Sequence, residues 1–292
     1  MRLCRFGDDR LGLVVDERHL VDVTYTLDLL PSQRWPLLPG DPLLAHLDAV
    51  LAAVEDRRVT TQVDISSVPL RSIVTSPTKI MAAPANYRRH VEEDTLDPGV
   101  DQGVHRAQLA GVLEPVEELG LFLKASSSLA GPGDGIRVPA GPARTDYEVE
   151  LAVVIGRAAR DVAAADAMDH VAGYCLGLDM SVRGKQDRSF RKSGDSFTVL
   201  GPWLTTADEI ADPSALTLWL SLNGEERQRS STSAMTVGIP RMIEMASRTY
   251  TLHPGDVLLT GTPEGVGPVV PGDVIVAGAD GLGTMTVAVT GA

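Results

Sequence analysis

The stretch DYEVELAVVI at residues 146–155 combines acidic and apolar residues in one predicted strand. Successive side chains of a strand point to opposite faces, so Glu148 and Glu150 share a face. Both carboxylates enter an apolar run that we expect to be buried on at least one side. Neighbouring buried carboxylates need a cation, a shared proton or an arginine partner. This segment alone is equally compatible with a metal site and with a solvated acidic surface strand.

A third acid favours the metal site. The segment AGYCLGLDMS at residues 172–181 is apolar and ends near a lone aspartate, Asp179. Three carboxylates without a nearby Cys or His cluster favour a hard ion, Mg²⁺ or Mn²⁺, with Ca²⁺ as a third option. Such an ion would keep open positions for water and substrate.

The composition is that of a globular protein, with 292 residues, 43% hydrophobic and 22% charged. A formal charge of −13 argues against nucleic-acid or anionic-membrane partners, which need a basic surface. Two cysteines, Cys4 and Cys175, supply neither a disulfide framework nor a Cys-rich zinc site, which predicts a reducing compartment. No leader-like or bilayer-length apolar segment is evident, so we expect a cytoplasmic protein with a small-molecule substrate.

Short apolar runs punctuated by 28 glycines and 19 prolines predict a β-rich chain with many turns. Residues 1–72 form a small N-terminal domain in this interpretation, with strands at 2–6, 12–15 and 20–23. Asp41 caps a predicted helix that begins at Pro42. Residues 73–292 would form the second, larger domain.

An acidic segment interrupts the larger domain. Eight acidic residues and one arginine lie between Glu92 and Glu118. An exposed surface loop and a functional lid over about 86–120 explain this segment equally well.

Other polar residues carry little information individually. His90 and Glu93 are three residues apart and would face each other on a helical turn, as a water-activating pair requires, but exposed pairs of this kind are common. Four further residues, which singly are more often on the surface, are Lys124, Arg183, Gln186 and Lys192. The Gly-rich turn at 260–267 lacks the Gly-Lys-Ser/Thr of a P-loop, so phosphate binding is not expected.

Taken together and in chain order, the motifs over residues 78–290 resemble the fumarylacetoacetate hydrolase superfamily. The matching pieces are Asn86-Tyr87-x-x-His90-x-x-Glu93, Leu123-Lys124, DYEVEL at 146–151, Gly173-Tyr174, Asp179-x-Ser181-x-Arg183-x-x-Gln186, Lys192-Ser193, LGPW at 200–203, NGE at 223–225, GDV at 255–257 and TGTPEGVG at 260–267.

The resemblance implies a mixed, β-rich α+β fold in which rolled sheets surround a metal site, with a small N-terminal α+β domain. It implies Mg²⁺ or Mn²⁺ held by Glu148, Glu150 and Asp179, and a homodimer. His90 and Glu93 would form the water-activating dyad on a lid, and Lys192 would stabilise charge. The implied substrate contacts are Tyr87, Lys124, Arg183, Gln186 and Thr262.

The chain departs from the family pattern at three points. Gly184 stands where an aspartate often follows the arginine, which removes a buttress for Arg183. Gly194 stands where phenylalanine is common, which predicts a wider pocket. The spacing from His90 to Lys124 is also longer than in compact members, so the predicted lid carries the acidic insertion.

The implied reaction is hydrolysis of a C–C bond in a 2,4-dioxo acid, such as an acylpyruvate or a fumarylpyruvate-like compound, to pyruvate or a related oxo acid plus a carboxylic acid. A metal-stabilised enolate is the expected intermediate. An acidic lid would disfavour a second anion, which predicts a neutral acyl tail. The alternatives are a 2-oxo acid decarboxylase, an isomerase or hydratase of aromatic catabolism, and an inactive metal-stabilised binding protein.

Overall fold

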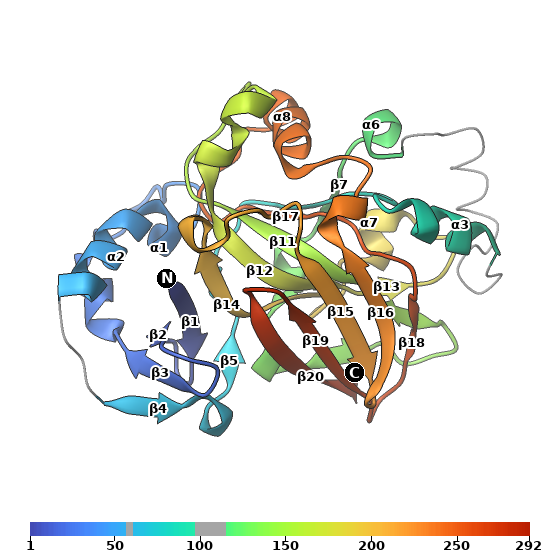
Figure 1. The fold of residues 1–292 in the computed structure, drawn as a ribbon, viewed down its shortest axis with the longest axis horizontal. Coiled ribbons are helices and arrows are strands. Elements are labelled where there is room, and N and C mark those ends of the chain that lie inside the picture. Colours follow the sequence, from blue (N-terminus) through green and yellow to red (C-terminus); the bar gives the residue numbers. More distant parts are fainter. Residues whose placement is uncertain (57–60, 97–114) are drawn as a thin grey trace.

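A computed structural model describes residues 1–56, 61–96 and 115–292 (Figure 1). Its largest sheet has twelve strands among these residues. Ten follow one another in the order β4 (Gln62–Asp64), β3 (His19–Asp22), β2 (Arg10–Val14), β1 (Arg2–Phe6), β14 (Thr198–Thr206), β12 (Val171–Asp179), β11 (Val149–Ile155), β17 (Val257–Leu259), β6 (Ile80–Ala82) and β7 (Phe122–Lys124). β5 (Leu70–Arg71) pairs with β1, and β8 (Leu129–Ala130) pairs with β14.

Two smaller sheets complete the β structure of the described part. One holds β13 (Ser181–Val182), β10 (Thr145–Tyr147) and β18 (Gly267–Val269). The other, at the lower right of Figure 1, holds β16 (Glu225–Ser231), β15 (Thr217–Leu222), β19 (Val274–Ala279), β20 (Gly283–Gly291) and β9 (Ile136–Val138).

Helices are short and lie around the sheets. The α-helices are α1 (Pro42–Ala45), α2 (Leu47–Asp56), α3 (Arg88–Leu96), α6 (Pro115–Leu119), α7 (Arg188–Arg191) and α8 (Ile239–Thr249). The 3₁₀ helices are η1 (Thr24–Leu29), η2 (Ile65–Ser67), η3 (Ser126–Ser128), η4 (Pro132–Asp134), η5 (Ala164–His170), η6 (Ala207–Glu209) and η7 (Thr232–Ala234). The predicted mixed, β-rich α+β class is confirmed.

The centre of the large sheet is buried on both faces. Every residue of β11, β12 and β14 is buried. Along β11, Leu151 and Val153 join one hydrophobic cluster, with residues of the five-stranded sheet, whereas Ala152 and Val154 join another on the opposite face. Because both faces of β11 are buried, successive residues are apolar and the apolar run of the sequence is continuous.

The N-terminal strands extend this same sheet. Leu3 of β1 pairs with Leu204 of β14. The Asp41 carboxylate accepts hydrogen bonds from the backbone N–H groups of Leu43 and Leu44, at 3.0 and 3.3 Å, and so caps α1 as predicted. The apolar side of α1 and α2 packs in the cluster that contains Ala152. The domain boundary near residue 72 stays a prediction.

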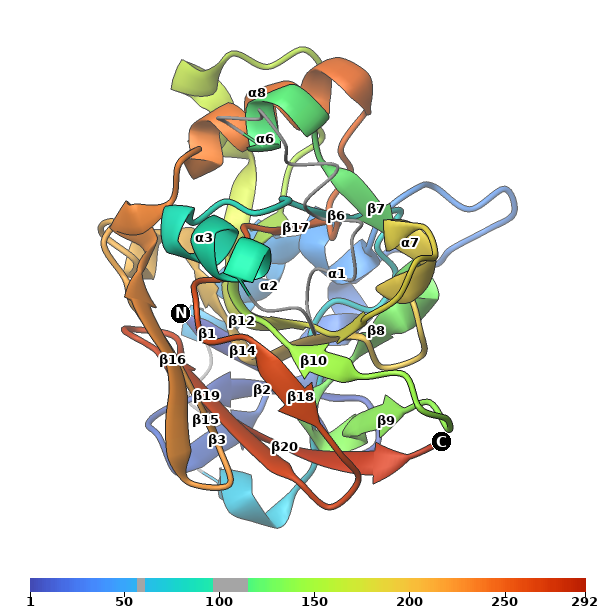
Figure 2. The ribbon, with the colours of Figure 1, turned by 90° about the vertical axis from the view of Figure 1, so that its right-hand side faces the viewer.

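The predicted lid over about 86–120 is described only in part, because residues 97–114 lie outside the described residues. Figure 2 shows α3 and α7 on either side of one face of the molecule, above β10 and β18. Across the described ranges, no helix is long and apolar enough to span a bilayer.

Both cysteines are deeply buried, and burial raises the pKa of Cys4 and of Cys175 to about 12. We therefore expect neither thiol of the folded protein to react with Ellman's reagent at neutral pH, whereas both react after denaturation, because the thiolate is the reactive form. Rapid reaction of either thiol in the native protein would contradict this arrangement.

Candidate metal centre and active site

Three buried carboxylates meet where β11 and β12 lie side by side. Glu148 lies between β10 and β11, Glu150 belongs to β11, and Asp179 ends β12. The strands pair with Glu150 opposite Gly177, and the Asp179 N–H donates to the Glu148 carbonyl oxygen at 2.9 Å. One oxygen from each carboxylate lies within 4.8 Å of the other two. The structure thus brings together the three acids expected to bind metal.

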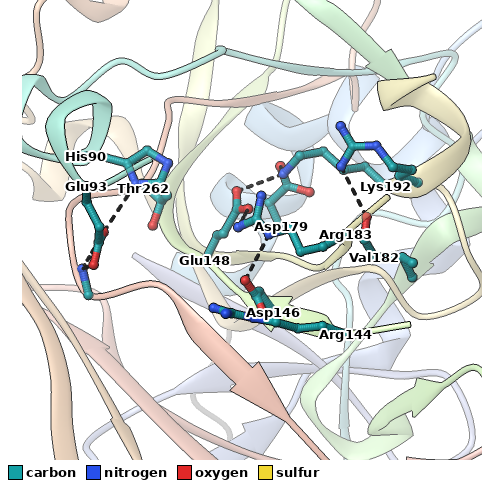
Figure 3. Close-up of polar contacts among 12 residues, drawn as sticks. His90, Glu93, Arg144, Asp146, Glu148, Asp179, Val182, Arg183, Lys192 and Thr262 are labelled. Atoms are coloured by element: carbon teal, nitrogen blue, oxygen red, sulfur yellow. Dashed lines mark hydrogen bonds and ion pairs between the residues drawn. The ribbon is translucent and has the colours of Figure 1, made fainter. Parts of the chain in front are cut away.

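Two lysines neutralise part of this charge. Lys192 Nζ donates to Glu148 Oε2 at 2.7 Å and to Asp179 Oδ2 at 2.6 Å (Figure 3). Lys124 Nζ donates to Asp179 Oδ1 and to the Phe197 carbonyl. Burial opposes the charge on Lys192, but Asp179 and Glu148 outweigh it and hold its pKa above the ordinary value. Burial lowers the pKa of Lys124, against the attraction of Asp179.

Asp146 supplies the carboxylate contact to Arg183 that Gly184, which has no side chain, cannot supply. Arg183 Nε donates to Asp146 Oδ2 at 2.8 Å, and Arg183 Nη2 donates to Glu148 Oε1 at 3.1 Å. Arg144 Nε donates to the other Asp146 oxygen at 2.6 Å (Figure 3). Burial opposes ionisation of Glu148, but Lys192 and Arg183 outweigh it and keep its pKa below the usual range. Arg183 is therefore held between two carboxylates.

Among the described residues, no lysine or arginine donates a hydrogen bond to Glu150. Its Oε2 accepts a hydrogen bond from the Gly261 N–H at 2.6 Å. Burial, Asp179 and Glu148 together raise its pKa well above the ordinary value. A cation among the three carboxylates would relieve this repulsion, and an all-oxygen donor set suits a hard divalent ion. The residues present therefore fit Mg²⁺ or Mn²⁺, as predicted.

The Gly-rich segment 260–267 holds two acids through its backbone. Gly261 has φ +96°, and a Cβ there would lie 2.7 Å from Asn86 Cβ. Gly265 has φ +94°, and a Cβ there would lie 1.9 Å from the Arg227 carbonyl oxygen. The Gly265 N–H donates to both oxygens of Glu93, at 3.1 and 2.9 Å. Only glycine suits these close approaches, so the segment can point one amide at Glu150 and another at Glu93.

His90 and Glu93 lie together on α3. His90 Nδ1 is 3.6 Å from Glu93 Oε2, an ion-pair distance rather than a good hydrogen bond. Burial works to raise the pKa of Glu93, but His90 and the Gly265 amide outweigh it and lower that pKa. The His90 ring is buried and faces the same pocket as the carboxylates (Figure 3).

One pocket collects most of the residues named from the sequence. Its lining contains His90, Glu148, Glu150, Arg183, Lys192 and Thr262, together with Ala83, Pro84, Ala85, Phe122 and Arg188.

The other predicted site residues lie outside this lining. Lys124 and Asp179 are buried and joined to each other by an ion pair. Tyr87 is buried, and its hydroxyl has no hydrogen-bond partner among the described residues. Gln186 is exposed, and its Oε1 lies 2.3 Å from the position of a Cβ built on Gly184.

Sequence reasoning missed Gln228, a buried residue of the otherwise largely exposed strand β16. Its Nε2 donates to Thr262 Oγ1 and to the Pro263 carbonyl, both at 2.9 Å, and its Oε1 accepts from the Val149 N–H at 3.0 Å. The polar sequence EERQRSS contains no signal for this role. Arg188 was also missed, although it precedes Lys192 by one helical turn.

Manganese binding tests the triad directly. At about 100 times its Kd, Mn²⁺ should stabilise the metal-free protein by about 2.7 kcal/mol, measured by thermal unfolding. Glu150→Gln should abolish this response while leaving the metal-free protein at least as stable, because a repelled buried carboxylate is removed. The exposed variant Asp195→Asn is the control. An unchanged Mn²⁺ response in Glu150→Gln would reject this site.

Gln228→Ala should lower the free energy of unfolding by about 1–3 kcal/mol, because the buried Val149 N–H loses its partner. Urea unfolding measures the change, with Gln62→Ala on the exposed strand β4 as the control. Equal stability of both variants would contradict a structural role for Gln228.

Comparison with known proteins agrees with this geometry. The family model described as "Fumarylacetoacetate (FAA) hydrolase C-terminal" matches residues 79–290. Maleylpyruvate hydrolase of Aquipseudomonas alcaligenes is 49% identical over 290 residues, which cover 99% of each chain.

Solved structures have the same fold. The structure of maleylpyruvate hydrolase from Sphingobium sp. SYK-6 in complex with manganese(II) and pyruvate is 38% identical, with a TM-score of 0.82 and 99% of each chain covered. A probable 2-hydroxyhepta-2,4-diene-1,7-dioate isomerase from Mycobacterium abscessus is 28% identical, with a TM-score of 0.77, covering 100% of this chain and 98% of that one. As the order of its motifs predicted, the chain belongs to the fumarylacetoacetate hydrolase family.

Proposed function

We propose that this protein is a metal-dependent hydrolase that cleaves a C–C bond of an acylpyruvate, releasing pyruvate and a carboxylic acid. The observation that carries the proposal is one pocket in which a buried carboxylate triad and the His90–Glu93 pair meet. The full-length similarity to a maleylpyruvate hydrolase supports the same reaction class.

Glu148, Glu150 and Asp179 would hold the ion, Mg²⁺ or Mn²⁺. When bound, the ion supplies Lewis-acid stabilisation of negative charge on the oxo-acid oxygens. Lys192, which donates hydrogen bonds to Glu148 and Asp179, adds a fixed positive charge beside the proposed ion site. Arg183 is positioned by Asp146 and Glu148, so its guanidinium meets the substrate without first having to reorganise.

His90 would accept a proton from the attacking water. Glu93 orients the imidazole and stabilises its protonated form, and the Gly265 amide holds Glu93 in place. Tyr87, Lys124, Gln186 and Thr262 stay proposed substrate contacts. Closure of α3 over the pocket would exclude bulk water.

The alternatives are less well supported. A decarboxylase needs no attacking water, so decarboxylation gives the His90–Glu93 pair no catalytic role. The isomerase neighbour has 28% identity, against 49% for the maleylpyruvate hydrolase. A homodimer and a cytoplasmic location remain part of the proposal.

His90→Ala should lower the rate of pyruvate release from an acylpyruvate by about 10²–10⁴-fold, the usual contribution of a general base. Mass spectrometry of the products, with Mn²⁺ and with EDTA, measures this loss. The stabilisation of His90→Ala by Mn²⁺ should be retained, which separates proton transfer from metal binding.

The outcome of that experiment also separates the reaction classes. Metal-dependent loss of carbon dioxide from oxaloacetate, without any pyruvate release from acylpyruvates, would contradict hydrolysis. It would leave His90 and Glu93 with a structural role.

A further inference from the structure

We propose that Gln228 is a positioning residue that makes the Thr262 hydroxyl a hydrogen-bond donor toward the pocket, so that the pocket selects a ligand with an acceptor oxygen at that point. This inference deepens the proposed function and rests on it, because the acceptor would belong to the oxo-acid end of the substrate. Gln228 is not among the residues that line the pocket, so it would act through Thr262 and not by touching the substrate.

An irregularity of β16 turns Gln228 inward. Glu226 pairs with Ser221 of β15 and Gln228 pairs with Leu220, so Arg227 is an extra residue in β16. A β-bulge of this kind bends the strand and redirects the side chains beside it. The three residues before Gln228 are exposed, whereas Gln228 is 1% exposed. The bulge therefore buries one amide side chain in a strand that is otherwise largely exposed.

Backbone groups fix which end of the Gln228 amide faces Thr262. Its Oε1 accepts a hydrogen bond from the Val149 N–H at 3.0 Å, and its Nε2 donates to the Pro263 carbonyl oxygen at 2.9 Å. A backbone N–H only donates and a backbone carbonyl only accepts, so the opposite orientation of the amide would lose both hydrogen bonds. The Nε2 group is therefore the end that lies beside Pro263 and Thr262.

This orientation leaves Thr262 one way to bond to Gln228. Gln228 Nε2 lies 2.9 Å from Thr262 Oγ1, and Oγ1 accepts this hydrogen bond because an amide NH₂ group only donates. Among the described residues, the Thr262 hydroxyl makes no other hydrogen bond, so its own proton has no acceptor there. Thr262 is buried and lines the same pocket as Glu148 and Lys192, where this proton is available to a ligand.

The oxo-acid end of the proposed substrate presents acceptors that suit this donor. Two cations, Lys192 and Arg183, line the pocket together with Thr262. A further donor beside them favours an oxygen that only accepts hydrogen bonds, as the oxygens of a carboxylate and of a ketone do. Both kinds are present in a 2-oxo acid. Fixing the direction of the hydroxyl in advance avoids the cost of orienting it when the ligand binds.

A purely structural role of Gln228 leads to a different expectation. Gln228 supports the same turn whose Gly261 and Gly265 amides donate to Glu150 and Glu93. If Gln228 only supported this turn, its removal would disturb both acids whether or not residue 262 carries a hydroxyl. If Gln228 orients that hydroxyl, its effect on ligand binding requires the hydroxyl to be present.

Pyruvate binding to the Mn²⁺-loaded protein, measured by isothermal titration calorimetry, separates the two roles. Thr262→Val should weaken binding by about 10- to 100-fold, because a hydrogen bond to a charged ligand is lost, whereas Thr262→Ser should stay within about threefold. Gln228→Met should weaken binding by about 3- to 10-fold. In the double variant, Gln228→Met should add no more than about twofold to the loss caused by Thr262→Val.

Metal binding and kinetics supply readouts that a structural role would change differently. Gln228→Met should keep the stabilisation by Mn²⁺ in thermal unfolding. Its KM for acetylpyruvate should rise while kcat stays within about threefold, the pattern expected when ground-state binding is lost. Gln62→Met on the exposed strand β4 is the matched control and should leave pyruvate binding unchanged.

Nuclear magnetic resonance tests the hydrogen bond without any Gln228 variant, and so holds even where such a variant fails to fold. In the wild type, both side-chain amide protons of Gln228 should exchange slowly with water, because each has a buried acceptor. In Thr262→Val, one of them should exchange faster, while the proton donated to Pro263 stays protected.

The outcomes are distinct. Losses that multiply in the double variant, or unchanged exchange of the Gln228 amide in Thr262→Val, would overturn the orienting role while leaving hydrolysis intact. Failure of the wild type to release pyruvate from acetylpyruvate and to bind pyruvate with Mn²⁺ would instead reject the proposed function, and with it this inference.

Discussion

Burial of like charges in one small volume is the constraint on which the rest of the site depends. Glu150 and Asp179 belong to the fully buried strands β11 and β12 and Glu148 directly precedes β11, so water screens these charges poorly. An ionised group in such a place is tolerated only when it is paired and hydrogen-bonded. Lys192, Lys124 and Arg183 supply that pairing for Glu148 and Asp179, whereas Glu150 relies on one backbone amide. The repulsion that Glu150 feels from Asp179 and Glu148 is what makes the place suitable for a divalent ion.

The same constraint explains the segment at residues 260–267. A backbone N–H can approach a carboxylate closely without adding a second charge, and two glycines allow the chain to aim such donors at Glu150 and Glu93. Thr262 lies between them and faces the pocket. This one turn therefore connects the carboxylate triad to the His90–Glu93 pair. The His90–Glu93 pair and the carboxylate triad are positioned by a common piece of backbone.

The charged centre also depends on contacts between distant segments. Lys192 caps the C-terminal end of α7 and donates to Glu148, whereas Arg188 begins α7 and lies over the Phe122 ring of β7. The Lys192-Ser193 motif is local in the sequence. The packing of α7 against β7 instead brings together two segments that are far apart in the chain.

The sequence by itself determined the features that depend on near neighbours and on chain order. Alternation placed Glu148 and Glu150 on one face at the start of a buried strand, Asp41 and Pro42 marked the start of α1, and the ordered motifs identified the family. Only the tertiary structure decided the partners: Asp146 with Arg183, Gln228 with Val149, Arg188 over Phe122, and Gln186 in solvent. The partners in the first two pairs are 37 and 79 residues apart. Local periodicity reports which face of an element is buried, but such pairings depend on how distant strands and helices pack, because burial and charge act through space and not along the chain.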